Sequence, residues 1–145
     1  MMQIGWASRE FTPARPAMLQ GQMHRRIARS ALDPLPGTAW ALEGQAPDDT
    51  TLFISCDLVS IPDALCLTVR ELLANRVPGL LADHIIMNAT HTHTSLVLKA
   101  GSYDPPESDV MTPAECLAWV AGSAVEAAAE AWDTRKLGVL GRAFG

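Results

Sequence analysis

The chain has 145 residues, which is enough for one domain with a hydrophobic core, and its 48% apolar content excludes a disordered polypeptide. Its 11 basic and 16 acidic side chains give a net charge of −5 without a basic run, which excludes a nucleic-acid backbone as the partner. The three cysteines form no CxxC pair, so they predict buried free thiols rather than a disulfide framework or a cysteine zinc site.

The N-terminal residues carry no recognisable targeting signal. No basic stretch is followed by an apolar stretch, so no signal peptide is predicted. No apolar run approaches the roughly 18 residues that a transmembrane segment needs. We expect the chain as given to be soluble and cytoplasmic, and an incomplete N-terminus would leave secretion open.

Two strands and a loop are predicted in the first third of the chain. Residues 3–10 predict the first strand. Residues 17–36 predict an irregular loop that carries a basic patch and His24. Residues 38–43 predict the second strand, and residues 46–49 predict a turn.

A strand, a helix and a second strand follow within about 40 residues. Residues 52–58 form a nearly continuous apolar run, which indicates a strand covered on both faces. Ser60 is the predicted N-cap of a helix that ends before Pro78-Gly79. Residues 84–90 predict the next strand. Together these elements predict a βαβ unit with parallel strands and a right-handed crossover.

A second helix is predicted from Thr112-Pro113-Ala114-Glu115, which is a capping box with proline at the first helical position. It should run to about Trp132 and pack an alanine-rich face closely on a sheet. Residues 137–140 predict a further strand. The expected fold class is therefore α/β, a mixed sheet with at least one parallel βαβ unit and with helices packed on it.

Two histidines follow the second strand of the predicted βαβ unit. His91 and His93 stand at i and i+2, and an extended backbone would send both side chains to one face. Asp57 ends the neighbouring parallel strand, and open α/β sheets bind ligands beyond these strand ends. Two imidazoles side by side suit a metal ion, or one ligand and one group that handles protons. The alternative is a pair of polar residues that only bond to backbone or water.

A catalytic zinc ion needs about three protein ligands and one open position. His84 begins the strand that His91 follows, and roughly seven residues at about 3.3 Å each place them too far apart to share an ion. His24 lies in a loop and could approach the pair. Asp57 could be a ligand, could orient a histidine, or could be only a cap or turn residue before the helix.

Residues 88–95, Asn-Ala-Thr-His-Thr-His-Thr-Ser, resemble the Thr-His-Thr-His motif of the neutral/alkaline (non-lysosomal) ceramidases. Residues 4–13 resemble the opening strand of that family, and residues 53–58 resemble its apolar strand that ends in Ala-Asp-Leu. The resemblance extends through the alanine-rich helix to the end of the chain. We therefore expect residues 1–145 to form the N-terminal portion of a ceramidase-like zinc hydrolase domain, an incomplete part of a larger catalytic domain.

The resemblance implies a zinc-dependent amidase of sphingolipid metabolism, which splits the N-acyl bond of ceramide into sphingosine and fatty acid. It implies that His91 is a Zn²⁺ ligand and that His93 polarises the scissile carbonyl or stabilises its oxyanion. It also implies a lipid-like or other N-acyl substrate. The remaining ligands of the family, a histidine, a glutamate and a tyrosine, belong to the rest of the catalytic domain, which is then a required partner.

The sequence departs from the family directly after the motif. Residues 94–98 read Thr-Ser-Leu-Val-Leu where the family usually has Ser-Gly-Pro-Gly-Gly. A zinc hydrolase of a different N-acyl or ester substrate therefore stays open. A truncated module without catalysis is the third hypothesis, and we expect the isolated 145-residue chain to be inactive.

Overall fold

A computed structural model describes residues 1–46 and 48–143. Pro47, in the predicted turn at 46–49, lies outside the described residues, as do the last two residues of the predicted 1–145 domain. Across the described ranges, no helix is long and apolar enough to cross a membrane. The three cysteines are free, and Cys56 and Cys116 are buried as predicted, whereas Cys66 is only partly buried.

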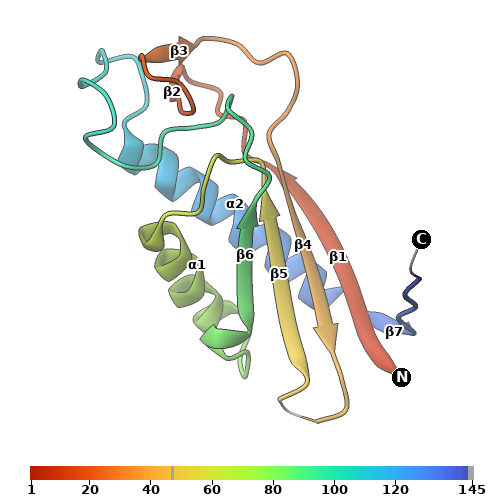
Figure 1. The fold of residues 1–145 in the computed structure, drawn as a ribbon. Coiled ribbons are helices and arrows are strands. Elements are labelled where there is room, and N and C mark those ends of the chain that lie inside the picture. Colours follow the sequence, from red (N-terminus) through yellow and green to blue (C-terminus); the bar gives the residue numbers. More distant parts are fainter. Residues whose placement is uncertain (47, 144–145) are drawn as a thin grey trace.

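A five-stranded mixed sheet forms the centre of the molecule (Figure 1). Its strand order is β6-β5-β4-β1-β7, and all neighbouring strands are antiparallel except the parallel pair β5 and β6. The strands are β1 (Met2–Glu10), β4 (Pro36–Glu43), β5 (Thr50–Cys56), β6 (Ile85–Ala89) and β7 (Lys136–Gly138). The predicted α/β class and the parallel pair of the βαβ unit are therefore confirmed.

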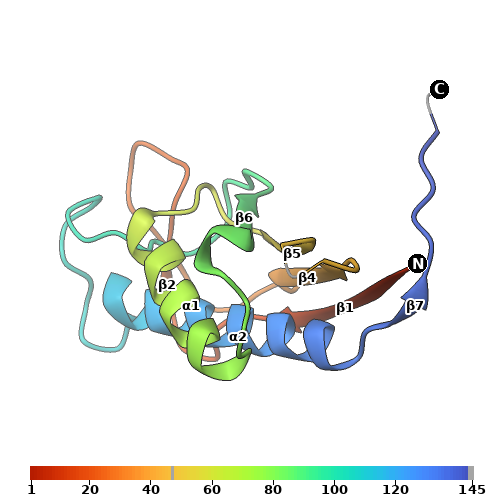
Figure 2. The same ribbon diagram turned by 90° about the horizontal axis from the view of Figure 1, so that it is seen from below.

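Both α-helices, α1 (Asp63–Arg76) and α2 (Pro113–Asp133), cover the same face of the sheet (Figure 2). The alanines of α2 that were expected to face the sheet are buried. Gly5 of β1 lies so close to α2 that a Cβ atom there would stand 2.1 Å from the Ala131 carbonyl oxygen. Small side chains at this contact let the helix and the strand approach closely, and the main core lies between them.

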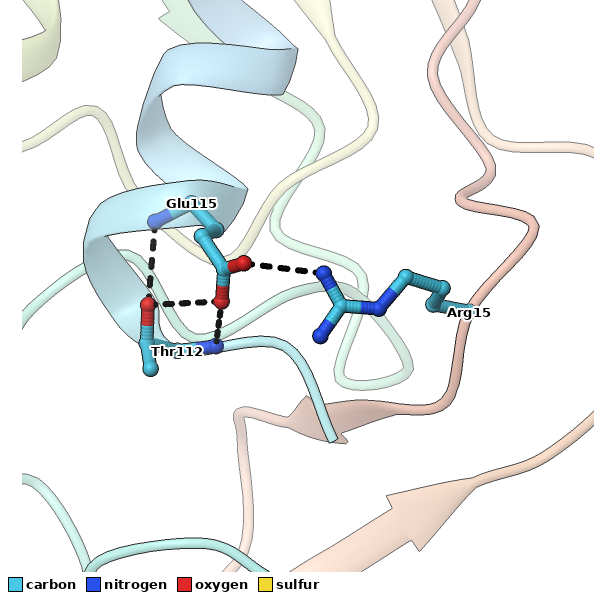
Figure 3. A network of polar contacts seen from close by, with 3 residues as sticks. All are labelled: Arg15, Thr112 and Glu115. Carbon is cyan, nitrogen blue, oxygen red and sulfur yellow. Dashed lines mark hydrogen bonds and ion pairs between the residues drawn. The ribbon is translucent and has the colours of Figure 1, made fainter. Parts of the chain in front are cut away.

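The capping box of α2 is present as predicted (Figure 3). The Glu115 N–H donates to Thr112 Oγ1 at 3.2 Å, and the Thr112 N–H donates to Glu115 Oε2 at 2.8 Å. The other carboxylate oxygen accepts a hydrogen bond from Arg15 at 2.8 Å. The Thr112 N–H, the Arg15 guanidinium and the Thr112 hydroxyl lower the pKa of Glu115 to about 2.

The start of α1 differs from the prediction. Its N-cap is Pro62, which has no side-chain hydrogen bond to the helix, so Ser60 is not the cap. Pro62 presets an extended backbone just before the helix, and Asp63 in the first turn favours the positive end of the helix dipole. The predicted end before Pro78 is confirmed, because the helix stops at Arg76 and Val77 is its C-cap.

The segment 17–36 is not the irregular loop that was predicted. It contains a two-stranded antiparallel hairpin, β2 (Ala17–Leu19) and β3 (Arg26–Ala28), at the end of the molecule where β5 and β6 finish (Figure 1). Two ion pairs tie the hairpin to the segment before α2. They are Arg25–Glu107 at 3.0 Å and Arg29–Asp109 at 2.7 Å.

The prediction that residues 52–58 are covered on both faces is wrong for the described structure. Leu52, Ile54 and Cys56 are fully buried against the helices. The alternate residues Thr51 and Phe53 are only half-buried, because no described element covers that face of the sheet (Figure 2). The short strand β6 follows a single 3₁₀ turn, Ala82–His84, at its N-terminal end.

Candidate active site

The histidine motif lies in the loop after β6, beside the segment that follows β5. Two backbone hydrogen bonds join these segments, from the Thr90 N–H to the Cys56 carbonyl at 3.0 Å and from the His91 N–H to the Leu58 carbonyl at 2.9 Å. The motif is not the extended strand end that the i, i+2 argument assumed. His91 has φ = 67°, the one positive φ of a non-glycine residue among the described residues.

The two imidazoles nevertheless face each other. His91 Nε2 and His93 Nε2 are 3.3 Å apart, and the rings meet edge to face with centroids 4.8 Å apart. The Val59 carbonyl can only accept, so His91 Nδ1, at 2.7 Å from it, carries the proton. In the neutral ring this leaves a lone pair on His91 Nε2, and His93 Nε2–H donates to it. A left-handed residue therefore brings the rings together where a strand was expected to do so.

The separation of the two nitrogens fits a zinc ion. With the His93 proton on Nδ1 instead, two imidazole nitrogens on one tetrahedral zinc ion, each at about 2.0–2.1 Å, would lie about 3.3–3.4 Å apart. The bond from His91 to a backbone carbonyl is the kind of contact that fixes the tautomer of a metal ligand. Both side chains are exposed, so an ion could reach them.

The backbone of the motif is held from two sides. Arg26 of β3 donates to the His93 carbonyl at 2.5 Å and to the Gln20 carbonyl at 3.1 Å. Gly21 packs directly on His93, because a Cβ atom there would stand 2.6 Å from His93 Cβ. On the other side, the fully buried Ser95 Oγ accepts from the Val59 N–H at 3.1 Å.

Asp57 reaches the motif through a threonine rather than through an imidazole. Its Oδ1 accepts a hydrogen bond from Thr90 Oγ1 at 2.9 Å, one residue before His91. Asp57 does not cap α1, which begins at Asp63 after the N-cap Pro62. The carboxylate therefore stands beside the residue that leads into the left-handed turn, where it can orient the motif.

The other histidines do not complete a metal centre. His24 is exposed in the connection between β2 and β3, and His84 lies at the opposite end of β6 from His91. Within residues 1–46 and 48–143, no three His, Cys, Asp or Glu side chains are grouped so that they could hold a metal ion. The structure thus joins His91 and His93, adds Asp57 indirectly, and leaves His24 apart from any such cluster.

A cavity of about 490 Å³ opens beside the motif, between it, the hairpin and residues 29–35. The threonines that alternate with the histidines, Thr92 and Thr94, line it together with Asp57. Leu19 and Leu96 add apolar surface, so the cavity offers hydroxyl groups next to an apolar wall. Sequence reasoning missed this role of the hairpin and the contacts of Arg26 and Gly21 with His93.

No protein-family model and no curated protein matches the sequence. Among solved structures, the crystal structure of neutral ceramidase from Pseudomonas aeruginosa is similar over 93% of this chain, with a TM-score of 0.73 and 16% identity. A ceramidase complexed with C2 is similar over 93% of this chain, with a TM-score of 0.66 and 17% identity. The matched part is 22% of each ceramidase chain. The chain therefore has the fold of one part of neutral ceramidase.

Proposed function

We propose that this chain is part of a zinc-dependent amide hydrolase that cleaves an N-acyl bond, in ceramide or in a related N-acyl lipid. The observation that carries the proposal is the His91–His93 pair, whose Nε2 atoms are 3.3 Å apart at the strand ends of a ceramidase fold. In the proposed enzyme the other zinc ligands come from the rest of the catalytic domain.

His91 is the proposed zinc ligand. Its Nδ1–H is engaged by the Val59 carbonyl, so its Nε2 atom carries the lone pair that a metal ion would bind in place of the His93 donor. Zinc, when bound, acts as a Lewis acid that polarises a carbonyl and lowers the pKa of a water molecule. The left-handed backbone at His91 fixes where this nitrogen points.

His93 is the proposed catalytic residue. Its Nε2–H would donate to the oxygen of the scissile carbonyl as negative charge develops there. The Arg26 bond to the His93 carbonyl and the packing of Gly21 restrict the position of this donor before substrate arrives. A donor that is fixed in advance stabilises the oxyanion without reorganisation during the reaction.

Asp57 and His24 are proposed as supporting residues. Asp57 acts through its hydrogen bond from Thr90 and positions the turn that carries His91. His24 is exposed on the hairpin that contacts His93, and it would join the site only if the connection between β2 and β3 approaches the pair.

Zinc titration of the 145-residue chain tests the separate roles proposed for His91 and His93. We expect one weakly bound ion and no amide hydrolysis, because the single proposed ligand His91 is fewer than the three ligands of a catalytic site. His91→Ala should abolish binding, whereas His93→Ala should retain most of it. His84→Ala is the control, since His84 lies at the other end of β6. Tight stoichiometric zinc together with turnover in this chain would contradict the need for further ligands.

A hydrolase of another N-acyl or ester substrate is the second candidate. The observation that favours it is the segment after His93, where residues 95–98 are all buried against the hairpin rather than free beside the site. A panel of N-acyl amines and esters tests it with the full gene product. Hydrolysis of short N-acyl amines without action on ceramide would support this candidate, and efficient ceramide cleavage would eliminate it.

A further inference from the structure

The face of the sheet that the helices leave open carries a row of large apolar side chains. Trp6 pairs with Trp40, Trp40 with Phe53, and Phe53 with Ile86, in direct cross-strand register. The row therefore crosses four adjacent strands without interruption, from β1 to β6. The Trp40 and Phe53 rings stack with centroids 5.8 Å apart. Cross-strand aromatic pairs of this kind stabilise a sheet, and they also present a continuous apolar surface.

This surface is in contact with water in the described structure. Trp6 is 72% exposed and Ile86 is 44% exposed, whereas Trp40 and Phe53 between them are half-buried. Figure 2 shows both helices on the opposite side of the sheet. A contiguous apolar row with exposed large side chains at both ends is uncommon on a free-standing soluble domain and marks an interaction surface.

The polar side chains next to this row are hydrogen-bonded to one another across the strands. Toward the histidines, Ser8 donates to or accepts from Thr38 at 2.8 Å, and Asn88 donates to Ser55 Oγ at 3.1 Å. These polar side chains therefore have partners within the sheet. Burying polar groups that are already hydrogen-bonded costs much less than burying free ones.

The strand pattern also indicates two covered faces. Sheets made only of parallel strands are buried on both sides, and the pair β5 and β6 is the parallel part of this mixed sheet. The nearly continuous apolar run of β5 fits such an environment better than the half-open one described. A layer over the face of the sheet opposite the helices would give β5 and β6 the environment that their sequence indicates.

The comparison with ceramidases suggests which part of a protein would cover the open face of the sheet. The matched part is 22% of each ceramidase chain, so more than three quarters of such a chain lies outside it. The candidate zinc site also lacks ligands within the described residues. We propose that the Trp6–Trp40–Phe53–Ile86 row packs against an apolar face of the remaining part of a ceramidase-like domain. This inference rests on the shared fold and not on the chemistry of the histidines.

Oxidative footprinting of the full gene product tests the proposal within one molecule. Trp6 is more exposed in this structure than Trp119 of α2, which is 46% exposed. With hydroxyl radicals as the probe, we expect Trp6 to be oxidised at least about tenfold more slowly than Trp119. Oxidation of Trp6 as fast as that of Trp119 would overturn the proposal. So would protection that is lost on dilution, which means a second copy, or protection that appears only with phospholipid vesicles.

Charge substitution gives an independent test. Trp6→Lys should lower the thermal midpoint of the full gene product by several degrees, because a buried unpaired ammonium is strongly unfavourable. Trp6→Phe should restore most of the loss. Leu67→Lys is the matched control on α1, where Leu67 is 58% exposed. An unchanged midpoint in Trp6→Lys would contradict a cover over this row even if the zinc proposal were correct.

Discussion

His91 owes its conformation to the segment that follows β5. Its backbone N–H bonds to Leu58, and its Nδ1–H bonds to Val59, so both ends of the residue are held by consecutive carbonyls. A left-handed histidine costs free energy, of order 1–3 kcal/mol, and persists only where its surroundings fix it. In this conformation the Nε2 atom of the His91 ring faces His93.

Gly21 tests how strictly His93 is positioned. A Cβ atom at Gly21 would stand 2.6 Å from His93 Cβ, and Gly21 also has φ = 105°. Gly21→Ala should therefore destabilise the fold by at least about 1 kcal/mol and also displace His93. Chemical denaturation measures the first effect, and the ring resonances of His93 in NMR spectra measure the second.

Gly79→Ala separates the clash from the backbone effect. Gly79 has φ = 88°, but nothing lies within 4 Å of a Cβ atom there. Gly79→Ala should lower the free energy of unfolding by a similar amount, about 1 kcal/mol from the backbone, and leave the His93 resonances unchanged. If Gly21→Ala also left them unchanged, the hairpin would not position His93.

At the scale of single residues, the sequence identified the histidine pair but not the way it is built. The i, i+2 spacing led to the correct pairing for a wrong reason, since the expected extended backbone is replaced by a left-handed turn. The bonds that fix it come from Val59 and Arg26, which lie 32 and 67 residues from their partners. Such long-range contacts leave no local signal in a single sequence.

The capping box of α2 is an element that the sequence predicts well, because its bonds join residues three apart. Its carboxylate has a pKa of about 2, below the ordinary value of 4.5. A lowered native pKa means that the contribution of Glu115 is fully present above about pH 4.5 and is lost as the pH falls toward about 2. Thermal midpoints of Glu115→Gln should therefore lie below wild type at pH 7 and converge with it near pH 2.

Glu126→Gln is the control for this pH dependence. Glu126 is exposed in the middle of α2, away from the cap, and the same change of charge there should give little difference at either pH. A difference between Glu115→Gln and wild type that stays constant down to pH 2 would show that the loss does not arise from the ionised carboxylate.

Two glycine-to-alanine substitutions, one at the contact of β1 with α2 and one on the exposed side of α2, should change the stability in opposite directions. Gly5→Ala places a Cβ atom 2.1 Å from the Ala131 carbonyl oxygen, so helix and strand must separate, at a cost of about 1–3 kcal/mol. Gly122→Ala lies on the exposed side of α2 with nothing within 4 Å, and it should stabilise by about 0.5–1 kcal/mol. Urea denaturation measures both, and a neutral Gly5→Ala would refute the close approach.

Other elements escaped prediction because their determinants are not local. The hairpin strands have three residues each, and their ion pairs join residues about 80 positions apart. The start of α1 was misplaced because a proline, rather than a hydrogen-bonding side chain, precedes the helix. Short strands and helices without a side-chain cap therefore define the limit of what local patterns predict here.

At the scale of the whole molecule, the fold class and the parallel pair followed from the sequence. The strand order did not, because antiparallel pairing of β1 with both β4 and β7 is not encoded in any one segment. Helices cover one face, and a cross-strand aromatic row occupies the other. The histidine pair stands at the end of this sheet, beside a cavity of about 490 Å³. The arrangement is that of one part of the neutral ceramidase fold.

Amide hydrolysis by the full gene product tests the central claim most directly. With an N-acylsphingosine as substrate, we expect zinc-dependent turnover that His91→Ala abolishes. His93→Ala should lower kcat by about 10²–10³ with little change in KM, as for the loss of an oxyanion donor, while His84→Ala retains activity. Hydrolysis at the wild-type rate by His91→Ala, or an equal rate after complete removal of zinc, would contradict the account.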